Sequence, residues 1–564
     1  MSKETQTTTP QFYTTKTLWA GFVPDKNLQP NKVNEVRYDK ITYSEYFFSG
    51  RAVNGSERVR IFGVYATPDD KKAYNAILYI PDVSESPNFE MITEYVRMGY
   101  AVLAVDLCGK TESKGYCTVY PESISYANYE KRGNRMETVE ESAKETSWYE
   151  WVCVCRNALN FLFSQSKVKS VGVIGVKDGS NLAWILAAND NRIRCSVMMF
   201  GAGWQAYRGH FLHDDSSAKI ALSDEKRRFI AALDAHAYAP YVHCPVLYLT
   251  ATNNERFDLD RGYETICRIP EGVDRFYNCA PGFSEYLDTY CQKDVELFLK
   301  KYLDGRNIYM PTQPKIEYLQ NERQFSLNVK CDDKSEVVEI KVFCNEGVYD
   351  PAVRNWMPCE NIPEIGPNAF EYYLNGETTK IFFFAVVKYK SGITVASKVY
   401  SADVNKITSN RSAIIYSSKD GLEGIAFNDK NATKEKSIFV DQRKFITLGK
   451  GAEDIYGAYS QCGLISYRFG EPGCTIDEHS IIKLDVFASE FCIFRLAFLQ
   501  KSPSGAVEYH FSTELKASNV WKNLSINISD FKTADGLSIK DYSQVYAMRI
   551  DGDGKFLVNN ILLI

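Results

Sequence analysis

Residues 74–303 alternate short apolar runs with longer stretches of helical periodicity, and this alternation restricts the fold more than any other feature of the chain. The apolar runs include YNAILYI, YAVLAVDL, SVGVIGV and PVLYLTAT, and the helical stretches include MITEYVRMG, WYEWVCVCRNALNFLFSQ and SNLAWILAAN. Continuously apolar strands are typical of a parallel sheet that is covered on both faces. The pattern therefore predicts a doubly wound α/β domain.

The second half of the chain changes to strand periodicity. The segment DGRNIYMPTQPK is rich in turn-forming residues, which predicts a linker. The runs FSLNVKC, VVEIKVFCN and KIFFFAVVKY that follow it predict an immunoglobulin-like or fibronectin-like sandwich. IIKLDVFA, FRLAFLQK and FLVNNILLI predict a jelly-roll sandwich in the last part. We place the domains at 1–304, with an N-terminal extension, 305–405 and 406–564.

Composition excludes several classes of partner. The 564 residues carry a net charge of -5, so no basic field is present to attract nucleic acid. No stretch approaches the roughly 18 apolar residues of a membrane span, and no apolar segment follows the first lysine. We therefore expect a cytoplasmic protein with neither a nucleic acid nor a membrane as partner.

The cysteines point to a reducing compartment. Their number, 15, is odd, and they form no CxxC pair; Cys153 and Cys155 stand in an apolar helical stretch. We expect free thiols rather than a disulfide framework or a zinc site.

The stretch SVGVIGVKDGSNLAWILAA carries the most information about chemistry. A buried strand leads into a tight turn with Gly175 and Gly179 on either side of its apex, and a helix follows at once. In the motif G-x-S-x-G such glycines permit a sharp turn that exposes a nucleophilic serine. Here the apex is Lys177, followed by Asp178.

Residues 18–303 resemble the bacterial α/β-hydrolases that include acetyl xylan esterases, cephalosporin deacetylases and dienelactone-hydrolase-like proteins. The resemblance lies in VRIFGVYATP, GYAVLAVDLCG, SWYEWVCVCRNALNFL, the strand-turn-helix and CPVLYLTATNNERFDLDR. It implies an α/β-hydrolase domain, here followed by the two all-β sandwiches, with ester hydrolysis by a Ser-His-Asp triad.

All three triad positions depart from that family. Lys177 stands for the serine, Asn254 for the aspartate, and the loop CAPGFS, which should supply the histidine, has none. An amide cannot stabilise an imidazolium as a carboxylate does. We therefore expect no catalytic residues and a catalytically degenerate hydrolase, or pseudo-esterase. Its pocket is predicted to include Asp82, Gly175, Lys177, Asp178 and Gly179.

Neighbouring residues offer weaker alternatives. Ser180 lies three positions beyond the apex and is expected to cap or line the helix rather than attack a substrate. Asp178 as a nucleophile would shift the turn by one residue and lose both glycine positions. Lys177 as a Schiff-base amine would need a lowered pKa, whereas Asp178, Glu255 or Asp258 would keep it charged.

Two further motifs suggest ligands. His210, His213, Asp214 and Asp215 include an H-x-x-H pair with carboxylates, the residue types of a metal site, but we expect a solvated loop and no metal. The segment from about residue 409 resembles jelly-roll carbohydrate-binding modules. Such modules often hold a structural calcium ion between an early acidic residue and an aspartate on the last strand. The corresponding residues here are Glu423 and either Asn559 or Asn560, so an amide replaces one carboxylate. We therefore expect no tightly bound ion and no cofactor.

Tyr456, Tyr459 and Tyr467 either present rings to a sugar or pack the sandwich, and we favour packing. The leading hypothesis is a degenerate hydrolase that binds a small molecule or glycan in the old pocket, or a protein partner through the β domains. The alternatives are a carboxylic-ester hydrolase of the acetyl-esterase or dienelactone-hydrolase type with a non-standard site, and a structural subunit of an assembly.

Overall fold

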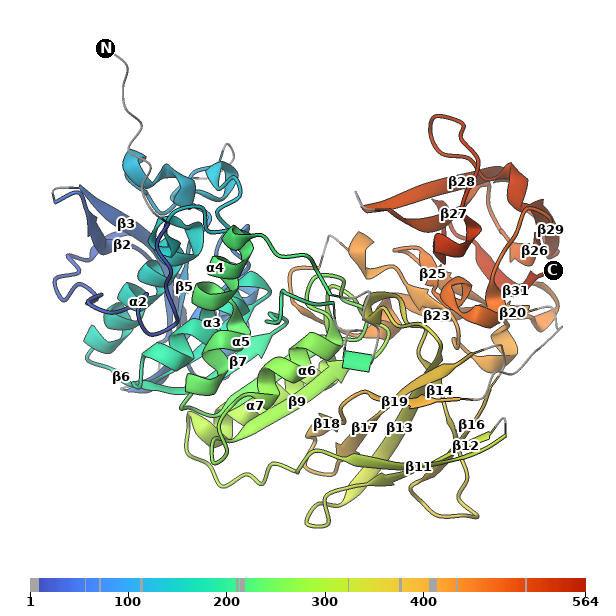
Figure 1. Ribbon diagram of the computed structural model, residues 1–564, viewed down its shortest axis with the longest axis horizontal. Helices are drawn as coiled ribbons and strands as arrows, with labels where there is room; N and C mark the ends of the chain where they lie inside the picture. Colours follow the sequence, from blue (N-terminus) through green and yellow to red (C-terminus); the bar gives the residue numbers. More distant parts are fainter. Residues whose placement is uncertain are drawn as a thin grey trace.

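The computed structural model shows an α/β domain followed by two β-sandwiches (Figure 1), which confirms the predicted fold class. In the helices that the structure describes, none is long and apolar enough to cross a lipid bilayer. The description covers residues 10–55, 57–69, 73–111, 115–208, 212–213, 219–322, 324–374, 378–404, 413–432, 435–502 and 505–564.

The α/β domain contains a nine-stranded sheet of order β1-β2-β3-β5-β4-β6-β7-β8-β9. Its first three strands pair antiparallel, and the other six run parallel to one another. The sheet is therefore mixed rather than wholly parallel, because an antiparallel meander precedes the alternating region. The strands are β1 (Asn31–Tyr38), β2 (Ile41–Val53), β3 (Glu57–Pro68), β4 (Tyr74–Ile80), β5 (Ala101–Val105), β6 (Val168–Val176), β7 (Ile193–Met199), β8 (Val246–Ala251) and β9 (Arg275–Ala280).

Helices cover both faces of this sheet. One buried cluster joins α1 (Phe89–Arg97) and α7 (Thr289–Tyr302) to one face. A second cluster joins α2 (Ser147–Ser164), α3 (Asp178–Asn189) and α6 (Leu259–Cys267) to the other. The parallel strands read as continuous apolar runs because both of their faces are dry.

The first sandwich consists of two sheets of orders β11-β12-β16-β15 and β14-β13-β17-β18, with β19 also paired to β17. All of its strand pairs are antiparallel. The strands are β11 (Lys315–Asn321), β12 (Gln324–Lys330), β13 (Val337–Glu346), β14 (Met357–Pro358), β15 (Glu360–Asn361), β16 (Ala369–Tyr373), β17 (Lys380–Tyr389), β18 (Thr394–Ala396) and β19 (Tyr400–Asp403).

The second sandwich pairs a sheet of order β23-β24-β31-β26-β29 with one of order β21-β25-β30-β27-β28, and β20 pairs with β31. The strands are β20 (Ala413–Tyr416), β21 (Ala426–Phe427), β23 (Ile446–Lys450), β24 (Tyr456–Ser460), β25 (Leu464–Ser466), β26 (Ile481–Phe487), β27 (Cys492–Ser502), β28 (Gly505–Leu515), β29 (Lys522–Asn527), β30 (Val545–Asp553) and β31 (Leu557–Leu563).

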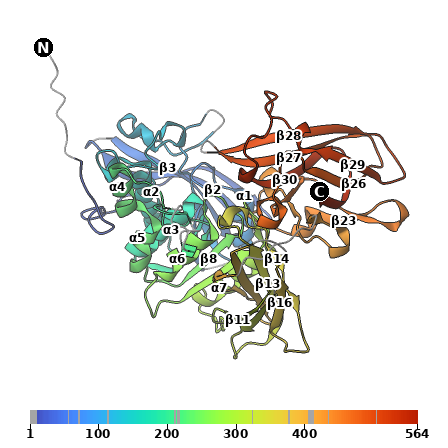
Figure 2. The same ribbon diagram turned by 45° about the vertical axis from the view of Figure 1, so that its right-hand side comes forward.

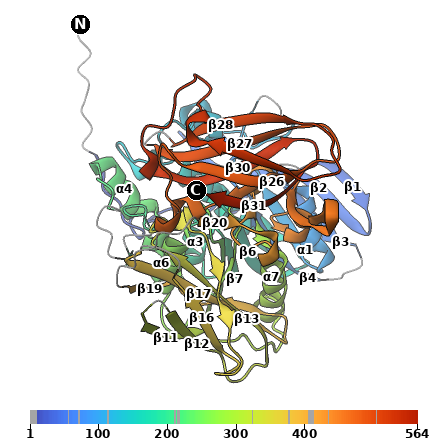
Figure 3. The ribbon, with the colours of Figure 1, turned by 90° about the vertical axis from the view of Figure 1, so that its right-hand side faces the viewer.

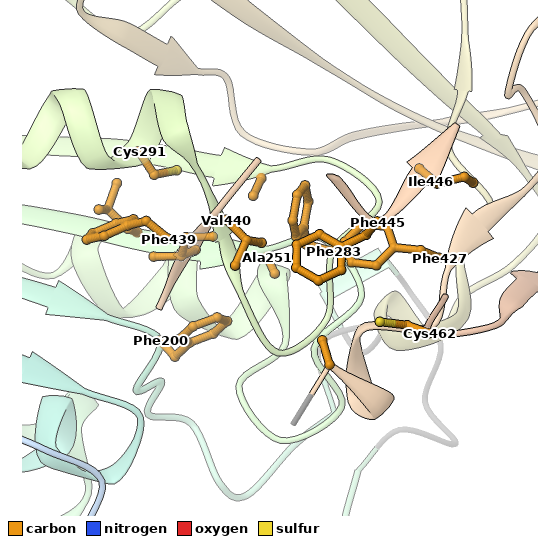
Figure 4. Packing of buried hydrophobic residues seen from close by; sticks show 14 of the residues in the cluster. Phe200, Ala251, Phe283, Cys291, Phe427, Phe439, Val440, Phe445, Ile446 and Cys462 are labelled. Atoms are coloured by element: carbon orange, nitrogen blue, oxygen red, sulfur yellow. The ribbon is translucent and has the colours of Figure 1, made fainter. Parts of the chain in front are cut away.

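Both sandwiches lie against the same side of the α/β domain, one above the other (Figures 2 and 3). The second sandwich also pairs with the α/β domain through a separate two-stranded sheet. In it, β22 (Phe439–Val440) runs parallel to β10 (Leu287–Asp288). Around this pair Phe439 and Val440 pack near Ala251, and Phe427 and Phe283 form an edge-to-face contact at 5.1 Å (Figure 4). One buried apolar cluster therefore runs through all three parts of the chain.

A buried arginine fastens the first sandwich to the α/β domain. Arg354, in the loop between β13 and β14, has 0% exposure, and its Nη1 lies 2.9 Å from Asp260 Oδ2 on α6. Burial raises the pKa of Asp260, but Arg354 and then His213 lower it more strongly, to about 2. Buried ions persist only when they are paired in this way.

His213 is part of the same contact, which corrects the prediction of a solvated loop. Its ring is buried, with Nε2 3.2 Å from Asp260 Oδ2 and Nδ1 3.0 Å from Ser401 Oγ of the first sandwich. His210, Asp214 and Asp215 lie outside the described residues.

Candidate functional site

The strand-turn-helix forms a strained turn with Lys177 at its apex. The backbone of Lys177 has φ 52° and ψ -118°, a region that a non-glycine residue rarely adopts and that costs about 1–3 kcal/mol. A methyl group at Gly179 would lie 2.3 Å from the carbonyl oxygens of Ile80 and Pro81. The turn therefore has the shape that exposes a nucleophile in α/β-hydrolases, with an amine in its place.

The ammonium group of Lys177 is paired with Glu285, and its Nζ lies 2.9 Å from Glu285 Oε2. Burial lowers the pKa of Lys177, but Glu285 raises it more strongly, so the pKa lies above its ordinary value. Glu285 belongs to the loop after β9, where the family resemblance places the histidine. The ion pair therefore joins the apex of the turn to the residue that directly follows the segment 279–284, in which the histidine was expected.

Glu285 was not among the partners predicted for Lys177, and those predictions are wrong. Asp178 pairs with Arg256 at 2.8 Å, and Glu255 pairs with Lys430 at 3.3 Å. Asp258 caps α6 and binds Arg261. Glu285 directly follows the segment 279–284 in which the histidine was expected, and its acidic side chain is the one sequence signal for this partner.

Asn254 links the turn after β8, called the acid turn here because the family resemblance places the triad aspartate in it, to the loop after β9. Its Oδ1 accepts hydrogen bonds from the backbone N–H groups of Arg256 (3.0 Å) and Phe257 (2.7 Å), and its Nδ2 donates to Ser284 O at 2.6 Å. A carboxylate would accept the first two bonds but would face the carbonyl of Ser284 without a donor. The amide is therefore a structural residue here.

The side chain of Ser180 is not accessible from the cavity over the turn. Its side chain is fully buried on α3, and its Oγ donates to Phe200 O at 2.9 Å. A methyl group at Gly201 would lie 2.6 Å from Ser180 Oγ, so backbone packs directly against the hydroxyl. Ser180 is therefore a buried residue of the helix, as its spacing from the apex predicted. A substrate carbonyl could not reach its hydroxyl.

The second sandwich fixes the loop that carries Glu285. Asp429, in the short 3-10 helix η9 (Asp429–Asn431), accepts hydrogen bonds at its Oδ2 from the backbone N–H groups of Ser284 (2.7 Å) and Glu285 (2.8 Å). Its Oδ1 also accepts from the Ser284 hydroxyl. Burial raises the pKa of Asp429, and the bonds from Ser284 oppose that rise. Sequence spacing gave no sign of this contact, since 145 residues separate the partners.

A cavity of about 750 Å³ lies over the turn. Lys177, Asp82 and Glu285 contribute to its wall, whereas Gly175, Asp178 and Gly179 are buried and do not line it. Burial raises the pKa of Asp82, and Lys177 opposes that rise. The remaining wall residues that carry charge are Glu85, Asp429, Lys430, Glu435 and Lys436.

The described residues contain no group of three or more His, Cys, Asp or Glu side chains placed to hold a metal ion. At the expected calcium-ligand positions of the second sandwich, Glu423 is exposed, and Asn559 Oδ1 accepts a hydrogen bond from Ser418 N at 2.8 Å. Asn560 Nδ2 donates to Asp485 Oδ2 at 2.8 Å. Each of the two amides is thus engaged within the sandwich.

The three tyrosines that could contact a sugar, Tyr456, Tyr459 and Tyr467, differ in their exposure to solvent. Tyr456 is 47% exposed, whereas Tyr467 packs on a small apolar cluster that includes Val353 of the first sandwich. Tyr467 also lines a second cavity, of about 510 Å³, between the three parts of the chain. Tyr459 is half-buried under Lys555.

Asp178 should make stability depend on pH. Burial raises its pKa from 3.8 to about 7, although Arg256 opposes the rise. Between these values Asp178 keeps a proton in the native state that it loses in the unfolded state, so Asp178 should contribute a fall in stability of about 1.4 kcal/mol for each pH unit. Asp178→Asn should remove this fall, because the asparagine does not titrate.

Urea unfolding of both proteins between pH 4 and pH 8 measures the slopes. Arg256 is 57% exposed, so water can solvate it in the variant. Glu122→Gln, at a side chain that is 87% exposed and faces only an exposed lysine at 4.0 Å, is the control and should keep the slope of the unmodified protein. Equal slopes in Asp178→Asn and the unmodified protein would contradict the assignment.

Residues 61–265 match the model of the dienelactone hydrolase family. Among solved structures, an acetyl xylan esterase from Paenibacillus sp. is 15% identical, covering 52% of this chain and 97% of its own, with a TM-score of 0.40. Acetyl xylan esterase 1 from Thermoanaerobacterium sp. is 16% identical, with 52% and 96% covered and a TM-score of 0.40. No curated protein matches the chain in sequence. The N-terminal domain thus resembles the esterase-like branch of α/β-hydrolases that includes the dienelactone hydrolases.

Proposed function

We propose that this protein is a catalytically silent, esterase-like binding protein, whose hydrolase domain holds a small polar ligand over the turn at Lys177 and does not cleave it. The observation that carries the proposal is the ion pair between Lys177, at the apex where the nucleophile would stand, and Glu285, directly after the loop segment expected to supply the base.

Acyl transfer needs a hydroxyl or thiol beside a proton acceptor. Lys177 supplies neither, and its raised pKa keeps the amine protonated and therefore not nucleophilic. Ser180 is buried, and none of the histidines that the structure describes lines the cavity over the turn. Asn254 is engaged by two backbone N–H groups and a carbonyl, so the third triad function is also missing.

The wall of the cavity indicates the kind of ligand. Asp82, Glu85 and Glu435 provide carboxylates, and Lys177 and Lys436 provide ammonium groups. An apolar ester would displace water from these charges without replacing its hydrogen bonds, which is costly. A small molecule with both a positive and a negative group would pair with both signs. The volume of about 750 Å³ falls in the range of about 300–1,000 Å³ that is typical of small-ligand sites.

The hydrolytic half of the proposal is tested with a fluorophosphonate probe and a panel of acetyl and aryl esters. We expect no stoichiometric labelling, and ester turnover that is the same in the unmodified protein and in Lys177→Met. Labelling of one serine in every molecule, or a loss of more than about tenfold in turnover on Lys177→Met, would show a working enzyme and overturn the proposal.

The binding half is tested by thermal shift and calorimetry with free amino acids and small amines as probes. A probe that binds should lose about tenfold in affinity in Asp82→Asn, which corresponds to about 1.4 kcal/mol. Asp485→Asn, a change on the far sandwich, is the matched control and should bind as the unmodified protein does. If no zwitterionic probe binds, or if both variants lose the same affinity, the ligand assignment is wrong.

A further inference from the structure

Two cysteines of the first sandwich lie with their sulfur atoms in contact. Cys344 is on β13, and Cys359 follows β14. Their Sγ atoms are 3.1 Å apart, closer than the roughly 3.5–4.0 Å of an ordinary contact between carbon atoms, although sulfur is larger. A disulfide bond of about 2.05 Å would therefore need only a small movement of the two side chains.

Strand register keeps the two thiols together. Cys344 is paired with Met357 in the antiparallel ladder, and Cys359 N donates to Val342 O at 2.8 Å. Both cysteines pack against the same buried cluster, so they share one face of the sheet on neighbouring strands. Their contact results from the pairing of the strands and does not depend on a surface loop.

The thiols differ in access to solvent. Cys344 is 0% exposed, and burial, together with the bond to Cys359, raises the pKa of its thiol. Cys359 is only partly buried. Because a thiolate is the attacking species, an external oxidant would meet Cys359 first, and Cys344 would then act as the resolving thiol.

The segment between the cysteines connects the sandwich to the hydrolase domain. Residues 345–358 include Arg354, which pairs with Asp260, and the carbonyls of Ala352 and Arg354, which accept from Asn253 Nδ2 at 3.2 Å and 2.8 Å. Asn253 directly precedes Asn254 of the acid turn. A covalent bond between Cys344 and Cys359 would therefore close the segment that holds the acid turn from outside.

We propose that Cys344 and Cys359 form an oxidation site that responds to small-molecule disulfides and fixes the docking segment 345–358. The Cys359 thiolate attacks one sulfur of a disulfide such as oxidised glutathione and expels one glutathione thiolate. Cys344 attacks Cys359 Sγ and expels the second thiolate, which takes up the proton of Cys344. The protein gives up two electrons and two protons, and the oxidant leaves as two glutathione thiols.

The experiment treats the full-length protein with oxidised glutathione, then alkylates the remaining thiols and maps the peptides by mass spectrometry. We expect a loss of about 2 Da, as for one disulfide, in a peptide pair that joins Cys344 to Cys359. Cys359→Ser should abolish this species. Cys344→Ser should instead stop at a mixed disulfide on Cys359. Cys267→Ser, at an exposed cysteine on α6, is the control and should still form the cross-link.

The effect on docking is read from hydrogen exchange of residues 345–358 in the oxidised and reduced protein. Oxidation should slow exchange in this segment by about tenfold, because closing it restricts local opening. Both cysteines remaining alkylatable after treatment, or a cross-link between other cysteines, would refute the site. A Cys344–Cys359 bond with unchanged exchange in 345–358 would refute its role in docking.

Discussion

The ion pair between Lys177 and Glu285 links the turn after β6 to the loop after β9. A strained turn projects the lysine over the end of the sheet, and a glutamate from the loop after β9 meets it at 2.9 Å. That loop is in turn held by Asp429 of the second sandwich through two backbone N–H groups. A partly buried ammonium needs such a partner, since an unpaired charge in this place would be costly.

The apex of the turn, Asn254 and the loop after β9 form one network. Lys177 binds Glu285, and Asn254 donates to the carbonyl of Ser284, the residue before it. The sandwiches hold the network from outside: the first through Asn253 and the loop around Arg354, the second through Asp429. The turn after β8 and the loop after β9 thus serve as docking points between domains.

Periodicity alone predicted the α/β domain and the two sandwiches, because a covered parallel sheet and an antiparallel sandwich impose different spacing of apolar residues. The turn at Lys177 was also predictable, since only glycine fits beside the carbonyl oxygens of Ile80 and Pro81. Glu285 and Asp429 were not, because their roles arise from contacts between segments distant in the sequence. For the same reason His213, in a polar stretch, was wrongly predicted to be solvated.

The pKa of the Lys177 amine tests the account most directly. It is measured from the pH dependence of Lys177 acylation by trace acetic anhydride, read by peptide mass spectrometry. The account predicts a pKa above the ordinary 10.5, because the attraction of Glu285 outweighs burial, and a lower value in Glu285→Gln. A pKa near 8 or below would reveal a neutral, nucleophilic amine at the turn, as in enzymes with an activated lysine, and would contradict the account.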